Sequence, residues 1–164
     1  TIANPLSPGD KVLACRHGVF SDKWIRMCEA FGLIVDVIEC DWRGPADPAL
    51  IEAALLADKN HAIKAVLATH NETATGVRSD LKAIRKSIDR AEHNALFFVD
   101  GVSSIASMDF QMDAWGIDAA VTGLGKYNSS AVSRSGAHPP TSFYIVRHIH
   151  IIDARTALYS CVEL

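Results

Sequence analysis

The sequence predicts an α/β fold with three layers, in which helices cover both faces of a mostly parallel sheet. Apolar segments of strand length alternate along the chain with segments of helical period. The predicted strands are nearly continuous apolar runs, as in sheets buried on both faces. With 164 residues, of which 49% are hydrophobic and 21% charged, the chain can form one domain with a substantial core.

The first half of the chain predicts two strands and two helices. The turn at Pro8-Gly9-Asp10 leads into a short buried strand over 11–15. Ser21 is expected to cap a helix that ends at Gly32, and its apolar residues recur at helical spacing at Trp24, Met27, Cys28 and Phe31. A strand rich in β-branched residues follows over 33–38, and an apolar helix over 48–57.

The second half predicts the rest of the sheet. Strands are expected over 62–68, 95–99 and 119–122. Between the first two, Ser79 or Asp80 can cap a helix whose buried stripe is Leu81, Ile84, Ile88 and Ala91. Residues 127–164 form an atypical tail, turn-rich at first, in which 142–152 could be a further strand.

Composition and charge argue against several classes of protein. A net charge of -3 and a pI near 6.1 give no reason to expect nucleic-acid or anionic-membrane binding. No apolar stretch approaches the roughly 20 residues that span a bilayer, and no signal peptide is visible at the start. The four scattered cysteines are expected to be reduced thiols in an intracellular protein. Since the chain lacks an initiator methionine and enters a strand almost at once, we expect a fragment.

Three polar clusters follow predicted strands, where open α/β sheets bind ligands. They are His70-Asn71-Glu72-Thr73, Asp100, and Gly123-Leu124-Gly125-Lys126. Asp100 is the most informative, because it ends the apolar run 96–99 and an unpaired buried carboxylate costs several kcal/mol. Either it surfaces at once or it meets a cation. Taken singly, each residue also has a structural explanation: strand-end aspartates often cap turns, and most loop lysines are solvated.

The combination of motifs is more specific than its parts. The segments "LSPGDKVLA", "HNETATGV", "FVDGVSSIASMDFQMDAWGID" and "VTGLGK" lie within residues 6–126. This stretch resembles the serine–glyoxylate and alanine–glyoxylate aminotransferases, which are pyridoxal-phosphate enzymes of the aspartate-aminotransferase fold type. The resemblance implies that residues 1–126 are part of the large domain of a homodimeric enzyme. It also implies amino transfer from serine or alanine to glyoxylate, with pyridoxal 5'-phosphate as cofactor.

The resemblance implies two catalytic residues. Asp100 would pair with the protonated pyridine nitrogen of the cofactor, and a carboxylate held there keeps that nitrogen protonated. Lys126 matches the lysine that binds the cofactor covalently. Once released by the substrate, its amine would move the proton at the substrate α-carbon.

Four further residues are implied as cofactor contacts. Thr73 falls near the ring oxygen or phosphate side of the cofactor, and Asn71 would be a second partner of the same ring oxygen. Val102 would pack under the ring, and Phe20 would stack on its other face. For Phe20 and Val102, plain core packing is an equal alternative.

Departures from the family pattern leave other hypotheses open. Leu124 and Gly125 stand where the family carries Ser-Gln, and the family's phosphate loop and small domain are absent. The segment alone is therefore expected to bind the cofactor weakly and to have little activity. Alternatives are a non-catalytic protein that keeps the fold, a pyridoxal-phosphate lyase such as a cysteine desulfurase, or a metal site among His138, His148, His150 and Cys161. Cytoplasmic and peroxisomal locations stay open.

Overall fold

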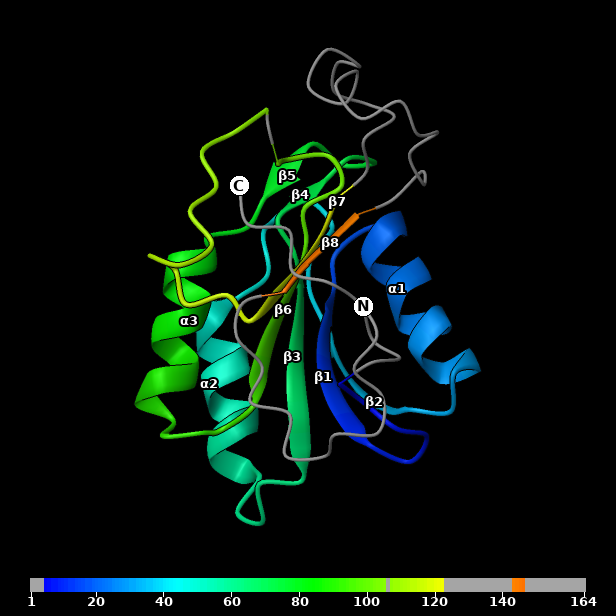
Figure 1. Ribbon diagram of the computed structural model, residues 1–164, viewed down its shortest axis with the longest axis vertical. Helices are drawn as coiled ribbons and strands as arrows, with labels where there is room; N and C mark the ends of the chain where they lie inside the picture. Colours follow the sequence, from blue (N-terminus) through cyan, green and yellow to red (C-terminus); the bar gives the residue numbers. More distant parts are fainter. Residues whose placement is uncertain (1–4, 106, 123–142, 147–164) are drawn as a thin grey trace.

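The computed structural model describes residues 5–105, 107–122 and 143–146. Its main sheet has six strands in the order β2-β1-β3-β6-β7-β8, and all neighbours are parallel except β7 and β8 (Figure 1). The strands of this sheet are β1 (Lys11–Arg16), β2 (Ile34–Glu39), β3 (Ile63–Thr69), β6 (Leu96–Asp100), β7 (Ala119–Thr122) and β8 (Phe143–Val146). The helices are α1 (Val19–Ala30), α2 (Pro48–Ala57) and α3 (Leu81–Arg90).

Helices cover both faces of the sheet, so the predicted three-layer α/β/α fold is confirmed. In Figure 1, α1 lies on one side of the sheet and α2 and α3 on the other. Successive strand residues point to opposite faces. Leu13 and Cys15 accordingly pack in the core cluster with α2 and α3, while Val12 and Ala14 pack in the cluster with α1.

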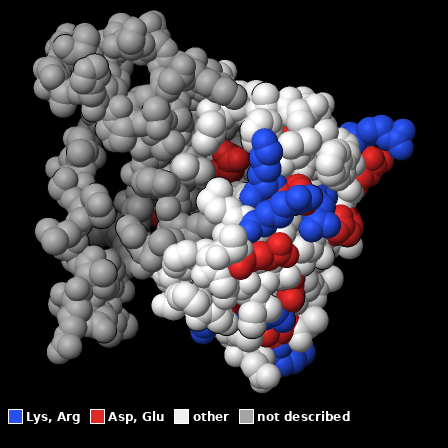
Figure 2. All heavy atoms as spheres, turned by 90° about the vertical axis from the view of Figure 1, so that its right-hand side faces the viewer, with Lys and Arg blue, Asp and Glu red and all other residues white. Residues whose placement is uncertain are grey.

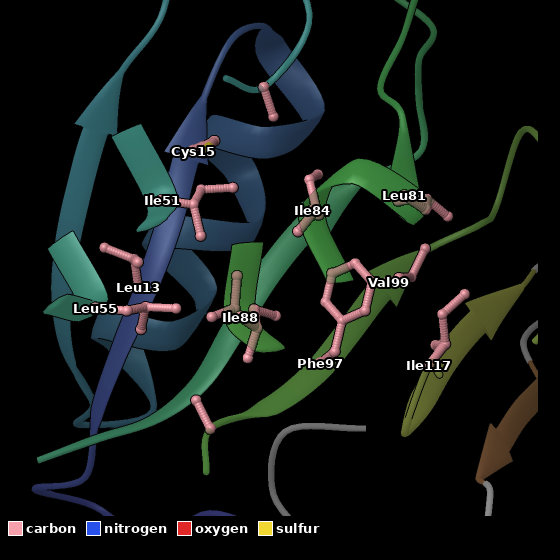
Figure 3. Packing of buried hydrophobic residues seen from close by; sticks show 14 of the residues in the cluster. Leu13, Cys15, Ile51, Leu55, Leu81, Ile84, Ile88, Phe97, Val99 and Ile117 are labelled. Atoms are coloured by element: carbon pink, nitrogen blue, oxygen red, sulfur yellow. The ribbon is translucent and has the colours of Figure 1, made fainter. Parts of the chain in front are cut away.

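The larger core lies between the sheet and the α2–α3 pair (Figure 3). Ile51 and Leu55 come from α2, Ile84 and Ile88 from α3, and Phe97 from the middle of β6; each is at most 2% exposed. Burying a side chain of this size contributes about 1.5–3 kcal/mol relative to leaving it exposed. Ile84 and Ile88 belong to the predicted buried stripe, so these positions are confirmed.

Side-chain caps define where two of the helices begin. Asp47 caps α2 by accepting a hydrogen bond from Ala49 N at 2.8 Å, with Pro48 in the first turn. Asp80 caps α3 by accepting from Ala83 N at 3.0 Å, which confirms one of the two predicted caps.

The predicted cap of α1 by Ser21 is wrong. The helix begins two residues earlier, at Val19, and Ser21 is buried in its first turn. The Ser21 hydroxyl accepts a hydrogen bond from His17 N at 3.1 Å and donates one to Gly18 O at 2.9 Å. The first amides of this helix find their acceptor elsewhere in the chain.

The sequence did not indicate a small antiparallel pair, β4 (Asn71–Glu72) and β5 (Val77–Arg78). Two-residue strands are too short to give a periodic pattern. In Figure 1 this hairpin lies at the end of the sheet where α1 begins. It therefore sits at the edge where the parallel strands end.

Charged side chains of both signs are interspersed on the face that Figure 2 shows. Ion pairs among the described residues include Lys11–Asp36 at 2.7 Å and Arg16–Asp22 at 3.1 Å. Within the described part of the chain, no helix is long and apolar enough to cross a membrane.

Candidate functional site

The carboxyl ends of the parallel strands form one edge of the sheet, and two polar residues meet there. Thr69 ends β3 and Asp100 ends β6, and the two are partners in the strand register. Leu67 and Phe98 pack in the cluster with α1, so Thr69 and Asp100, two residues further on, point to the same face. The candidate site is thus the sheet edge on the α1 side.

Asp100 is the last residue of β6, one residue later than the predicted strand end, and it is only partly buried. Its Oδ1 accepts a hydrogen bond from Val102 N at 2.9 Å. The chain turns at once after Asp100, because Gly101 N donates to Val121 O at 2.8 Å on the neighbouring strand β7. The apolar run therefore delivers this carboxylate to the sheet edge rather than into the core.

Two buried hydroxyls without a partner belong to segments that meet at this edge. Among the described residues, Thr69 Oγ1 and Ser104 Oγ have none, although the two residues are at most 2% exposed. Buried polar atoms in native proteins are nearly always paired, and exceptions call for an explanation such as a bound group. The orphaned Thr69 hydroxyl lies beside Asp100 in the register, so both fit a polar ligand at this edge.

Asn71 and Ser103 connect the two segments that leave the sheet here. Asn71 Nδ2 donates to Ser103 Oγ at 2.9 Å, and Ser103 Oγ donates to Asn71 O at 2.8 Å. One step earlier, His70 N donates to Asp100 O at 3.0 Å. These bonds hold the turn after β6, which contains Val102, against the segment after β3.

Glu72 connects the hairpin to α1. Its side chain is fully buried, and its carboxylate accepts hydrogen bonds from Phe20 N at 3.0 Å, Ser21 N at 2.9 Å and Ala74 N at 3.2 Å. The carboxylate thus replaces a helix cap and meets the positive end of the helix dipole. Only glycine fits at position 18, because a Cβ there would overlap the Glu72 side chain.

The remaining predicted site residues lie on the segments that these bonds join. Phe20 is in the first turn of α1, 39% exposed, with Lys23 Nζ 5.3 Å from its ring centroid. Thr73 is exposed in the turn between β4 and β5, and Val102 is half-buried after β6. Lys126 lies outside the described residues. Hydrogen bonds thus link the segments of Phe20, Asn71, Thr73, Val102 and Asp100 at one edge.

Two buried histidines lie at the same edge: His70, from the predicted polar cluster 70–73, and His17, which follows β1. Both ring nitrogens of His17 lack a partner among the described residues, and burial lowers its pKa against the opposing charge of Glu72. His70 contacts Trp115 edge-on at 5.8 Å; burial lowers its pKa too, with help from the Arg78 charge. Both are therefore neutral imidazoles near pH 7. His17 comes two residues after the predicted strand 11–15, and His70 comes two residues after the predicted strand 62–68, so a polar residue just beyond an apolar run was the signal for each.

Within the described ranges, no three His, Cys, Asp or Glu side chains are grouped as metal ligands would be. The residues of the alternative metal site, His138, His148, His150 and Cys161, all lie outside those ranges.

A family profile and several curated relatives match this chain. A profile of the family described as "Aminotransferase class-V" matches residues 1–131. L-aspartate–glyoxylate aminotransferase of Paracoccus denitrificans is 59% identical over 125 residues, which are 76% of this chain and 32% of that protein. Serine–glyoxylate aminotransferase of Methylorubrum extorquens is 56% identical over 125 residues, 76% of this chain and 31% of that protein.

Comparison with solved structures shows that related proteins share this fold. Ureidoglycine–glyoxylate aminotransferase from Bacillus subtilis superposes with a TM-score of 0.67 at 34% identity, covering 74% of this chain and 30% of that one. The chain spans about a third of the length of the curated relatives that it matches.

Proposed function

Because this chain belongs to the class-V aminotransferase family, we propose that the protein containing it transfers an amino group from an amino acid to glyoxylate. Serine is the proposed donor, leaving hydroxypyruvate, with alanine or aspartate as the competing donors. Glyoxylate would leave as glycine. The relatives named above support the acceptor, since each carries glyoxylate in its name.

One observation carries the proposal. Asp100 stands at the carboxyl edge of the sheet, on the α1 face, next to the orphaned hydroxyl of Thr69. A carboxylate so placed can hold a proton on a ring nitrogen of a bound heteroaromatic group. The neighbouring hydroxyl supplies a further hydrogen bond that the described chain leaves unused.

These residues fit pyridoxal 5'-phosphate as the cofactor. When bound, its protonated ring withdraws electrons from the α-carbon of an amino-acid substrate. Asp100 would hold the ring proton, Val102 and Phe20 would enclose the flat ring, and Thr73 and Asn71 would offer polar contacts. The Glu72 carboxylate would keep the Phe20 and Thr73 segments in register, because it binds amides of both segments.

Lys126 is the proposed base at the substrate α-carbon. The Lys126 amine must be neutral to act as nucleophile and proton carrier, and burial next to a cationic ring favours the neutral form. Residues 1–126 would be the part of the large domain that this chain contributes, in a homodimer. The Leu124-Gly125 pair before the lysine offers backbone donors alone to a phosphate.

Covalent trapping tests the proposal most simply. The protein expressed from its complete reading frame is mixed with pyridoxal phosphate, and a new absorbance band near the visible edge is sought. Borohydride reduction followed by peptide mapping should then place the adduct on Lys126, and Lys126→Ala should abolish the adduct.

The alternatives predict other outcomes. A cofactor adduct on Lys126 with sulfur release from cysteine, and no amino transfer to glyoxylate, would indicate a cysteine desulfurase instead. No adduct at Lys126 would favour a non-catalytic protein that keeps the fold.

A further inference from the structure

Two cysteines, one in β1 and one directly after β2, pack on the α2–α3 side of the sheet, away from the proposed cofactor contacts. Cys15 lies in β1 and Cys40 directly follows β2, and the register pairs Cys15 with Ile38. The chain continues beside β1 after β2 ends, because Cys40 N donates to Arg16 O at 3.0 Å. Both side chains pack against the α2–α3 core, where Figure 3 shows Cys15 next to Ile51.

The two thiols differ in exposure. Cys15 is 3% exposed, whereas Cys40 is partly exposed at the edge of the core. Both are free thiols in the structure. Cys40 can therefore meet a small reagent from solvent, whereas the buried Cys15 is shielded from it.

The surroundings make Cys40 the more acidic thiol. A hydrogen bond from the Cys15 thiol, helped by the backbone N–H of Asp47, lowers the pKa of Cys40 to about 7, against burial and the charges of Asp47 and Glu39. The same hydrogen bond, together with burial, raises the pKa of Cys15. Asp47 caps α2, so the Cys40 sulfur also lies near a helix N-terminus, which favours a thiolate.

We propose that Cys15 and Cys40 are a modification site at which a hydroperoxide, such as hydrogen peroxide, forms a reversible intramolecular disulfide. Cys40 is the thiol attacked first, and Cys15 is the resolving thiol. This proposal stands on the thiol pair alone and does not depend on the proposed transamination.

The chemistry balances in two steps. The Cys40 thiolate attacks one peroxide oxygen, the O–O bond breaks, and hydroxide leaves while Cys40 becomes a sulfenic acid. The Cys15 sulfur then attacks the Cys40 sulfur, the S–O bond breaks, and the Cys15 proton leaves with the oxygen as water. The sulfur pair loses two electrons and the peroxide gains them.

Cys28 provides a control within the chain. It is fully buried in the α1 cluster on the opposite face of the sheet, and burial raises its pKa to about 11. An alkylating reagent that reacts with thiolates should therefore modify Cys40 more than about tenfold faster than Cys28 at neutral pH.

The test uses the complete protein. After a stoichiometric dose of hydrogen peroxide, the protein is denatured, free thiols are alkylated, and peptides are mapped by mass spectrometry with and without a reductant. The expected product is a reducible link between the Cys15 and Cys40 peptides within one chain, with Cys28 alkylated. In Cys15→Ser, dimedone should trap a sulfenic acid on Cys40, and Cys28→Ser should still form the link.

Wild-type protein decides the question even if a variant fails to fold. Oxidation of Cys40 to sulfinic acid without a link, a link from Cys40 to Cys161, or a link between two chains would each overturn the proposal. So would unmodified Cys40 under conditions that oxidise free glutathione.

Discussion

The position of Asp100 shows how an apolar strand can end in a charged residue. The four residues before it are core or near-core, and the carboxylate emerges because the strand stops at the sheet edge and Gly101 turns the chain. One of its oxygens already accepts the Val102 amide. The same turn that solves the burial problem also aims this carboxylate at the α1 side of the sheet, where a cationic ring could be held.

At the scale of single residues, Glu72 offers a direct test. In Glu72→Gln one of the two acceptor oxygens becomes an NH₂ group, so the amides that faced it lose their acceptor, and a buried donor left unpaired costs about 1–3 kcal/mol. We expect a lower free energy of unfolding by urea and faster hydrogen exchange among the amides of Phe20, Ser21 and Ala74.

The matched control is Glu52→Gln, which removes a partly exposed ion pair to Arg90 at 2.7 Å. Pairs of this kind contribute about 0–1 kcal/mol. Equal effects of the two substitutions would contradict the capping role of Glu72.

At the scale of elements, the start of α1 depends on a close approach between Gly18 and Glu72. A Cβ at position 18 would displace the Glu72 side chain. We expect Gly18→Ala to destabilise the protein by about 1–3 kcal/mol, as overpacking of a filled core does, when unfolding is followed by circular dichroism.

Gly44→Ala serves as the comparison, since a Cβ at that position meets only Asp41 O at an ordinary 3.6 Å. Little change is expected there. If Gly18→Ala proved as stable as Gly44→Ala, the packing at the start of α1 would be looser than described.

The elements also show what local sequence can and cannot predict. Strand 119–122 and the Asp80 cap were predicted from apolar runs and capping chemistry within a few residues. The cap of α1 was missed because its acceptor, Glu72, lies 51 and 52 residues from its amide partners. A strand within 142–152 is confirmed at Phe143–Val146, antiparallel to β7.

The residues of the candidate site also differ in whether the local sequence could indicate them. Asp100 and Asn71 could be found because polar residues follow apolar strands. The Thr69 hydroxyl could not, since a threonine at the end of an apolar strand reads as core. That it lacks a partner depends on the neighbours that the fold brings to it.

At the scale of the whole molecule, the buried histidines predict acid sensitivity. Burial lowers the folded-state pKa of His17 and His70 from 6.5. The unfolded chain then binds more protons between the folded pKa and 6.5, so the stability is present above that range and is lost as pH falls through it. The free energy of unfolding should be lower near pH 5 than near pH 7.5.

Replacing His17 with Gln should weaken this pH dependence. A wild-type protein equally stable at both pH values would show that these imidazoles become charged at no cost.

We propose that the Asp100 carboxylate holds the proton on a cofactor ring nitrogen, and the rate of amino transfer tests this role directly. Amino transfer from serine to glyoxylate is compared in the complete wild-type protein, Asp100→Asn, and the surface control Asp41→Asn, at saturating pyridoxal phosphate and with the fold checked by circular dichroism. We expect Asp100→Asn to keep the fold and to lose about a hundredfold or more in rate, about 2.7 kcal/mol of transition-state stabilisation, while Asp41→Asn matches wild type. An Asp100→Asn protein that transfers amino groups at the wild-type rate would contradict it.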